Sequence, residues 1–277
     1  MWIEMMRHGS LFTGLGGFDL AASWMGWENV FQCEKDVFCR RLLEFYWPNV
    51  VCYEDVRKFD ARQFRGSIDI ISGGFPCQPF STAGRRKGTN DDRYLWPEMC
   101  RIVGEVRPRW IVGENVVGLL NWGRGMVFEK VLLDLESQGY EAWSYILPAA
   151  GVGAPHRRDR VWIVAYAAGL PGSEATEGRK EHYSQGEKDR LAPFTNGKGE
   201  YASSPFGLFQ RRDPWEDFPT QPPIFDRNDG LSTQLDGIAI SEWCEESIKG
   251  AGNAIVPQVA VEIFKAIGQM EARRDSI

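Results

Sequence analysis

The chain has 277 residues, of which 43% are hydrophobic, and its formal net charge at pH 7 is −6. This length allows one large domain or two of ordinary size with a real core, and the negative charge excludes a globally basic nucleic-acid-binding protein. No apolar run reaches the roughly 18 residues that cross a bilayer, and the N-terminus lacks the basic start and apolar core of a signal peptide.

Short apolar runs alternate with helical patterns between residue 1 and about residue 166. The apolar runs predict strands at residues 9–12, 29–34, 49–55, 68–74, 109–115, 140–148 and 159–166. The helical patterns predict helices at residues 18–26, 37–47, 95–106 and 127–138. Strands that alternate with helices of this length indicate an α/β fold with a doubly wound, mostly parallel sheet, which binds ligands at the carboxyl ends of its strands.

The composition changes after residue 166. A polar, charged stretch without periodicity follows and predicts a surface loop, and residues 191–240 are rich in Pro, Gly, Asp and aromatic residues. Helical periodicity returns at Pro257, where a proline suits the first turn of a helix. We therefore predict one domain made of residues 1–166 and 241–277, with a small, irregular second region at residues 167–240.

A glycine-rich turn, LFTGLGGF, follows the first predicted strand. Gly14, Gly16 and Gly17 would let the backbone approach a ligand, and the next helix offers free N–H groups; a plain tight turn is the alternative. Glu34 ends the second predicted strand and Asp55 follows the third, so they either bind the ribose and amine of an adenosine or are solvated loop-end acids. Because no phosphate-binding lysine follows the glycines, a nucleoside cofactor fits better than a nucleoside triphosphate.

Cys77 lies in the sequence GGFPCQPFS, just past the end of the strand predicted at residues 68–74. Two glycines and two prolines would hold this thiol on a preset loop, as a nucleophile requires. A reactive thiolate needs cationic neighbours, and the chain offers Arg85, Arg86, Lys87, Arg158 and Arg160. The alternative is an inert, packed thiol.

Glu114 and Asn115 begin the tripeptide ENV at the end of another predicted strand. A carboxylate at that buried edge is expected to have a raised pKa and could act as an acid, although a structural hydrogen-bonding role is the default for so short a pattern. Arg158 and Arg160 alternate as the last strand begins, so both should point to one face, to bind a ligand or to form salt bridges. His156 has no acidic cluster around it, so we predict no metal site.

These motifs resemble those of the cytosine-C5 DNA methyltransferases, especially the compact phage and prophage type. The sequence LFTGLGGF is similar to the cofactor loop of that family, GGFPCQPFS to its nucleophile loop and ENV to its acid motif. PHRRDR is similar to its Gln-x-Arg-x-Arg motif, and GNAIVPQVA to its C-terminal cofactor motif. The five motifs occur in the family's order, over residues 10–166 and 250–262.

The resemblance implies a Rossmann-like fold of the S-adenosylmethionine-dependent type, with residues 167–240 as a target-recognition region. It implies methyl transfer from S-adenosylmethionine to C5 of a flipped-out cytosine, with Cys77 adding to C6. Glu114 would then contact N3 and the exocyclic amine, Arg160 would contact O2, and Arg158 would help to hold phosphate and loop. The implied cofactor-binding residues are Phe12, Gly14, Gly16, Gly17, Glu34, Asp55, Pro76 and Asn253. The implied substrate-binding residues are Ser81, Arg85 and Asn115.

Two positions depart from the family pattern. His156 stands where the family usually has Gln, and Ser10 stands where many members have Asp. The family's usual motif before the last one is also missing, which leaves the limits of the target-recognition region open.

The resemblance implies double-stranded DNA as the partner of a monomer and leaves open whether a cognate restriction endonuclease exists. Methyl transfer to tRNA is an alternative, as are a catalytically silent nucleic-acid-binding relative and, more weakly, an oxidoreductase with a nucleoside cofactor. The six cysteines form no CxxC pair and no zinc spacing, so we expect reduced thiols in the cytoplasm of a bacterial or phage-infected cell.

Overall fold

A computed structural model describes residues 5–76, 94–167 and 240–274 of the chain. The region predicted to recognise the target, residues 167–240, lies almost wholly outside the described residues. Within the described ranges, none of the helices combines the length and the apolar character needed to cross a membrane.

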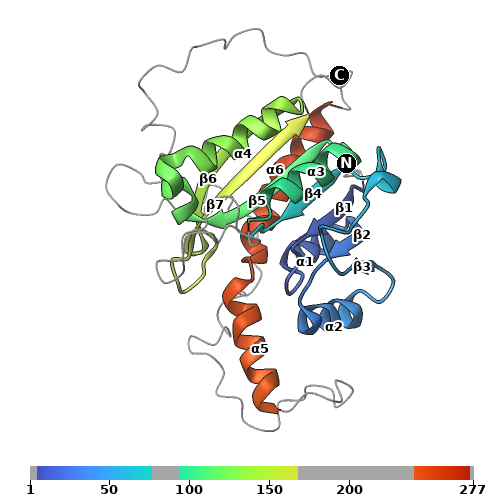
Figure 1. Cartoon of the computed structure of the whole chain (residues 1–277), viewed down its shortest axis with the longest axis vertical. Coiled ribbons are helices and arrows are strands. Elements are labelled where there is room, and N and C mark those ends of the chain that lie inside the picture. The colour runs from blue at the N-terminus through green and yellow to red at the C-terminus, as the bar shows by residue number, and fades with distance from the viewer. Residues whose placement is uncertain (1–4, 77–93, 168–239, 275–277) are drawn as a thin grey trace.

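The centre of the fold is a seven-stranded sheet with the order β3-β2-β1-β4-β5-β7-β6 (Figure 1). In that order, each of the first five strands, β3, β2, β1, β4 and β5, pairs in parallel with the next of the five. In contrast, β7 runs antiparallel to both β5 and β6. The strands are β1 (Arg7–Leu11), β2 (Glu28–Cys33), β3 (Val51–Tyr53), β4 (Ile70–Gly73), β5 (Trp110–Val116), β6 (Tyr140–Pro148) and β7 (Asp159–Ala167). The predicted doubly wound, mostly parallel sheet is therefore confirmed, and each predicted strand is present within a few residues of its expected limits.

Six α-helices are present in the described ranges, with short 3₁₀ segments between some of the elements. The helices are α1 (Gly17–Trp24), α2 (Val37–Tyr46), α3 (Trp96–Val106), α4 (Met126–Ser137), α5 (Ile240–Asn253) and α6 (Pro257–Arg274). The Asp36 side chain caps α2 by accepting bonds from two backbone N–H groups. As predicted, α3 ends just before Pro108 and α6 begins at Pro257. The 3₁₀ segments are η1 (Arg62–Phe64), η3 (Val117–Gly125) and η4 (Ala149–Val152).

Helix α5 was not expected from the sequence, which suggested regular helical periodicity only from Pro257. Gly250 and Gly252 lie in the last turn of this helix, and glycine weakens a helical pattern because it costs about 1 kcal/mol relative to alanine. In Figure 1, α5 extends away from the sheet and leads into α6.

Alternate residues of the central strands enter two cores, one on each face of the sheet. Ile71 and Ile111 pack with α3 and α4 in one core, whereas Ile70 and Trp110 pack with α1 and α6 in the other. Residues from the beginning and the end of the described chain thus cover the same face of one sheet.

Helix α6 is fixed to that face by aromatic and ionic contacts. The ring of Phe264 stacks on Trp27, with 4.8 Å between the ring centroids. The buried Glu271 carboxylate accepts a 2.8 Å hydrogen bond from Trp110 Nε1 and forms an ion pair with Arg109. A buried carboxylate is stabilised only when such partners are present, so these contacts fix α6 in one position on the sheet.

Candidate functional site

A cavity of about 710 Å³ opens at the carboxyl ends of the parallel strands, as expected for this class of sheet. Because β7 runs antiparallel, it begins at the same edge at which the parallel strands end. Nine of the predicted site residues line the cavity. They are Phe12, Gly14, Glu34, Asp55, Pro76, Glu114, Asn115, Arg160 and Asn253.

The turn after β1 brings backbone N–H groups to the wall of this cavity. Phe12 and Gly14 both have left-handed backbone conformations, with φ of 52° and 56°. The Gly14 N–H donates to Glu34 Oε2 at 2.7 Å, and the Asp36 N–H donates to Glu34 Oε1 at 2.8 Å. The two backbone donors therefore fix the Glu34 carboxylate at the end of β2.

Gly16 and Gly17 do not line the cavity, and the structure gives each of them a packing role. A Cβ atom on Gly16, whose φ is 80°, would lie 2.6 Å from the Trp47 ring, and one on Gly17 would lie 2.6 Å from Ile255 Cγ1. Real side chains do not approach so closely. These two glycines therefore allow Trp47 and Ile255 to pack directly against the start of α1.

Ser10, where many family members have Asp, is buried beneath the same turn. Its hydroxyl lies 3.1 Å from Asp19 Oδ1 and 2.9 Å from Thr13 Oγ1. Asp19 is buried in α1, and this burial raises the pKa of its carboxyl group. A carboxyl group is thus present under the turn, but α1 supplies it in place of β1.

Glu114 lies in β5, whereas Glu34 follows β2, and these strands are separated in the sheet by β1 and β4. The Glu114 side chain is buried, with 8% of the residue exposed. Its Oε1 forms a 3.0 Å ion pair with Arg160 Nε across the antiparallel β5–β7 pair. Burial raises the pKa of Glu114 from 4.5 to about 7, although the positive charges of Arg160 and Arg158 act in the opposite direction. The raised pKa predicted from the position of Glu114 is confirmed, and near neutral pH this residue can donate or accept a proton.

Asn115 is 6% exposed, and both ends of its side-chain amide are engaged. Its Nδ2 donates to the Phe75 carbonyl oxygen at 2.8 Å, and its Oδ1 accepts from the Val116 N–H at 2.9 Å. The amide thus holds the backbone that leads out of β4 to Pro76. Three predicted residues of the following loop, Cys77, Ser81 and Arg85, lie outside the described residues.

Arg158 does not line the cavity itself, and its side chain reaches the junction of α5 and α6. Its guanidinium donates to the carbonyl oxygens of Gly252, at 3.1 Å, and Ala254. These two residues flank Asn253, which lines the cavity. Arg158 therefore holds the segment that carries Asn253, an indirect role that its spacing from Arg160 did not suggest.

Several residues that line the cavity were missed in the sequence. Lys249 of α5 forms a 2.9 Å ion pair with Asp36, the cap of α2, and both side chains line the cavity, as does Trp122 after β5. Asp36 could have been found, since an acid directly before a helical pattern is a typical cap. Lys249 could not, because α5 itself was not predicted.

Cys33 and Cys39 also line the cavity, but burial raises the pKa of each thiol to about 12. Both are therefore protonated near neutral pH and are poor nucleophiles. Among the described residues there is no cluster of three or more His, Cys, Asp or Glu side chains that could hold a metal ion.

A family model for the C-5 cytosine-specific DNA methylases matches residues 6–204. The chain is 33% identical over 176 residues to the Type II methyltransferase M.PspPI of Psychrobacter sp., and 32% identical over 177 residues to the Type II methyltransferase M.AquIA of Picosynechococcus sp.. These matches cover 62% and 58% of this chain, and 42% and 71% of the two relatives. The chain thus spans less than half the length of the first relative.

The described fold is also similar to a solved structure, that of a mutant of Spodoptera frugiperda DNMT2. The TM-score is 0.52 at 21% sequence identity, and the match covers 64% of this chain and 54% of that one. At this identity the likeness concerns the fold alone. Because the family model spans well over half of the sequence, the chain belongs to the C-5 cytosine-specific DNA methylase family.

Proposed function

We propose that the protein is a DNA (cytosine-5)-methyltransferase that uses S-adenosylmethionine, the methyl donor of its family, and Cys77 as the nucleophile. The observation that carries this proposal is the composition of one cavity. It combines the Glu34 and Asp55 carboxylates with the buried Glu114–Arg160 pair, at the edge where the chain leaves β4 toward Cys77.

The residues of the cavity fit S-adenosylmethionine. A volume of about 710 Å³ is within the range of small-molecule sites. Glu34, held by two backbone N–H groups, would bind the ribose hydroxyls, and Asp55 would bind the adenine amine. Phe12 would border the cofactor, and Asn253 would close its site. When bound there, the cofactor supplies an electrophilic methyl group.

Glu114 and Arg160 would stabilise the target base during the reaction. With a pKa of about 7, Glu114 can carry a proton near neutral pH and donate it to N3 of cytosine. Arg160 keeps the same carboxyl group oriented through its ion pair and would donate to O2. Both interactions stabilise the negative charge that enters the ring when a thiolate adds to C6.

Cys77 is the proposed nucleophile because it directly follows Pro76, whereas the described cavity cysteines are held as thiols. Its thiolate would add to C6, which makes C5 nucleophilic, and C5 would then accept the methyl group. Loss of the C5 proton to a base would break the C6–sulfur bond and release Cys77. Ser81 and Arg85 are proposed to bind the phosphates that flank the target.

DNA is the proposed substrate because the matching family model describes cytosine-specific DNA methylases, and both relatives are Type II methyltransferases by name. We infer that residues 167–240 recognise the target sequence, inserted between the two parts of one cofactor-binding domain. Methyl transfer to tRNA is not favoured by these relatives. A monomer, a cytoplasmic location and a cognate restriction endonuclease stay predictions.

Mechanism-based trapping tests the proposal. DNA that carries 5-fluorocytosine at target sites should form a covalent adduct with the protein in the presence of S-adenosylmethionine, because fluorine cannot leave as a proton does. Cys77→Ser should abolish the adduct and leave cofactor binding unchanged. An adduct that persists in this variant would exclude Cys77 as the nucleophile. Bisulfite sequencing of DNA from a host that expresses the chain would identify the methylated sequence.

A further inference from the structure

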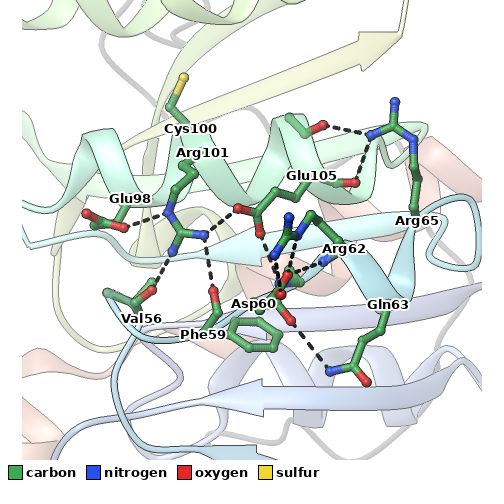
Figure 2. A network of polar contacts seen from close by, with 12 residues as sticks. Val56, Phe59, Asp60, Arg62, Gln63, Arg65, Glu98, Cys100, Arg101 and Glu105 are labelled. Carbon is green, nitrogen blue, oxygen red and sulfur yellow. Dashed lines mark hydrogen bonds and ion pairs between the residues drawn. The ribbon is translucent and has the colours of Figure 1, made fainter.

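Arg101, on α3, connects that helix to the turn that follows β3. Its Nη2 donates to the Val56 carbonyl oxygen at 2.7 Å, and its Nη1 donates to the Phe59 carbonyl oxygen at 3.1 Å. Figure 2 shows the guanidinium between these two carbonyl groups. One side chain therefore binds the turn at two points that are three residues apart.

Two acids of the same helix hold the guanidinium in this position (Figure 2). Arg101 Nε donates to Glu98 Oε2 at 2.9 Å, and Nη1 donates to Glu105 Oε1 at 2.6 Å. Glu105 uses its second oxygen to accept the Ala61 N–H at 2.9 Å. Charge-assisted bonds of this kind are stronger than neutral ones and orient the planar fork of an arginine. Arg101 is thus fixed before any ligand binds.

The turn that Arg101 binds forms one wall of the cavity. Asp55 and Val56 both line it. The hydrogen bonds of Asp55 lie within the turn: its Oδ1 accepts the Arg57 N–H, and its carbonyl oxygen accepts the N–H groups of Lys58 and Phe59. These bonds give the turn its shape but do not set its position relative to the rest of the fold.

Two features act directly on Val56 and Phe59 and help to set that position. The buried side chains of Val56 and Phe59 pack in the core that contains residues of α3 and α4. Arg101 holds the backbone of the same two residues. Apolar packing tolerates small shifts, whereas two hydrogen bonds from one rigid fork fix direction and distance. The strand before the turn, β3, has only three residues and pairs with β2 at the edge of the sheet.

We propose that Arg101 is a positioning residue for cofactor binding, which holds the turn so that Asp55 meets the adenine amine of S-adenosylmethionine. This inference rests on the proposed function. Arg101 contacts neither the cofactor nor the target base in this role, and it acts through Asp55.

The matched pair of variants is Arg101→Met and Arg62→Met, in the full-length chain. Arg62 lies beside the same turn, but its side chain is 75% exposed. In Figure 2 its guanidinium bonds with Asp60 and does not reach the carbonyl groups that Arg101 binds. Calorimetric titration with S-adenosylmethionine should show about tenfold weaker binding for Arg101→Met, the usual effect of losing bonds to a charged group. Arg62→Met should bind as the wild type does.

A double-mutant cycle with Asp55→Asn separates positioning from general stability. If Arg101 acts through Asp55, replacing Arg101 in the Asp55→Asn background should weaken binding by less than about twofold. Hydrogen exchange of the Lys58 and Phe59 amides, measured without ligand, should become faster in Arg101→Met and stay unchanged in Arg62→Met.

The possible results are distinguishable. Wild-type affinity in Arg101→Met, or a loss of equal size in the Asp55→Asn background, would overturn the inference and leave the proposed function intact. A wild-type chain that does not bind S-adenosylmethionine would contradict the proposed function, and the inference would fall with it. Unchanged amide exchange in Arg101→Met would show that the turn is held without Arg101 and would also overturn the inference.

Discussion

Replacing Glu114 with glutamine removes a carboxyl group whose pKa burial raises from 4.5 to about 7. Because the folded chain binds this proton more tightly than the unfolded chain does, the free energy of unfolding of the wild type falls as the pH rises between these two pKa values. This rise in pKa corresponds to about 3 kcal/mol of unfolding free energy in total, of which about 2 kcal/mol is lost between about pH 5.5 and about pH 8. Glutamine does not ionise, so the variant lacks this loss.

Urea denaturation of the wild type and of Glu114→Gln at a series of pH values measures this effect. The free energy of unfolding of the variant should rise by about 2 kcal/mol relative to that of the wild type between about pH 5.5 and about pH 8. Glu141→Gln, at an exposed position of β6, is the matched control for the loss of one carboxylate and should show no such trend. A difference between Glu114→Gln and the wild type that does not vary with pH would refute a proton-binding, buried Glu114.

Three further predictions concern the turn, the nucleophile loop and the cavity thiols. Gly16→Ala should lower the free energy of unfolding by about 1–3 kcal/mol in urea denaturation, because its Cβ meets the Trp47 ring and its φ is positive; an unchanged midpoint would mean that α1 shifts freely. Asn115→Ala removes the hydrogen bond to the Phe75 carbonyl oxygen and should slow covalent trapping about tenfold. Calorimetry should show unchanged affinity of this variant for S-adenosylmethionine. An unchanged trapping rate would contradict the role of Asn115 in holding the backbone before Cys77. Cys33→Ala should still trap 5-fluorocytosine DNA, since burial keeps this thiol protonated, and loss of the adduct in a chain that remains folded would count against Cys77.

Most of the fold could be predicted from the sequence because the signals are local. The apolar run of β5 and the proline at the start of α6 specify those elements through burial and backbone geometry. The carboxyl-end rule for parallel sheets then brings Glu34, Asp55 and Glu114 to one edge, and the structure has all three around one cavity.

The parts of the site that could not be predicted depend on pairs of residues that are distant in the chain. Arg160 reaches Glu114 because β7 lies antiparallel beside β5, and the sequence does not reveal this strand order. The same holds for Arg158, which binds carbonyl groups almost a hundred residues further on. Two arginines at alternate positions indicate that cationic side chains lie at the start of the last strand, but they do not indicate which residues these side chains contact.

The placement of α6 has a consequence for synthesis of the chain on the ribosome. All seven strands are complete by Ala167, but α6, which covers the face around Trp27 and Trp110, begins only at Pro257. At about 5–20 residues per second, a ribosome needs roughly 4 to 18 s to add the residues between these two positions. During that interval the part of this face that α6 later covers stays exposed on the nascent chain, and exposed apolar surface of this kind favours aggregation.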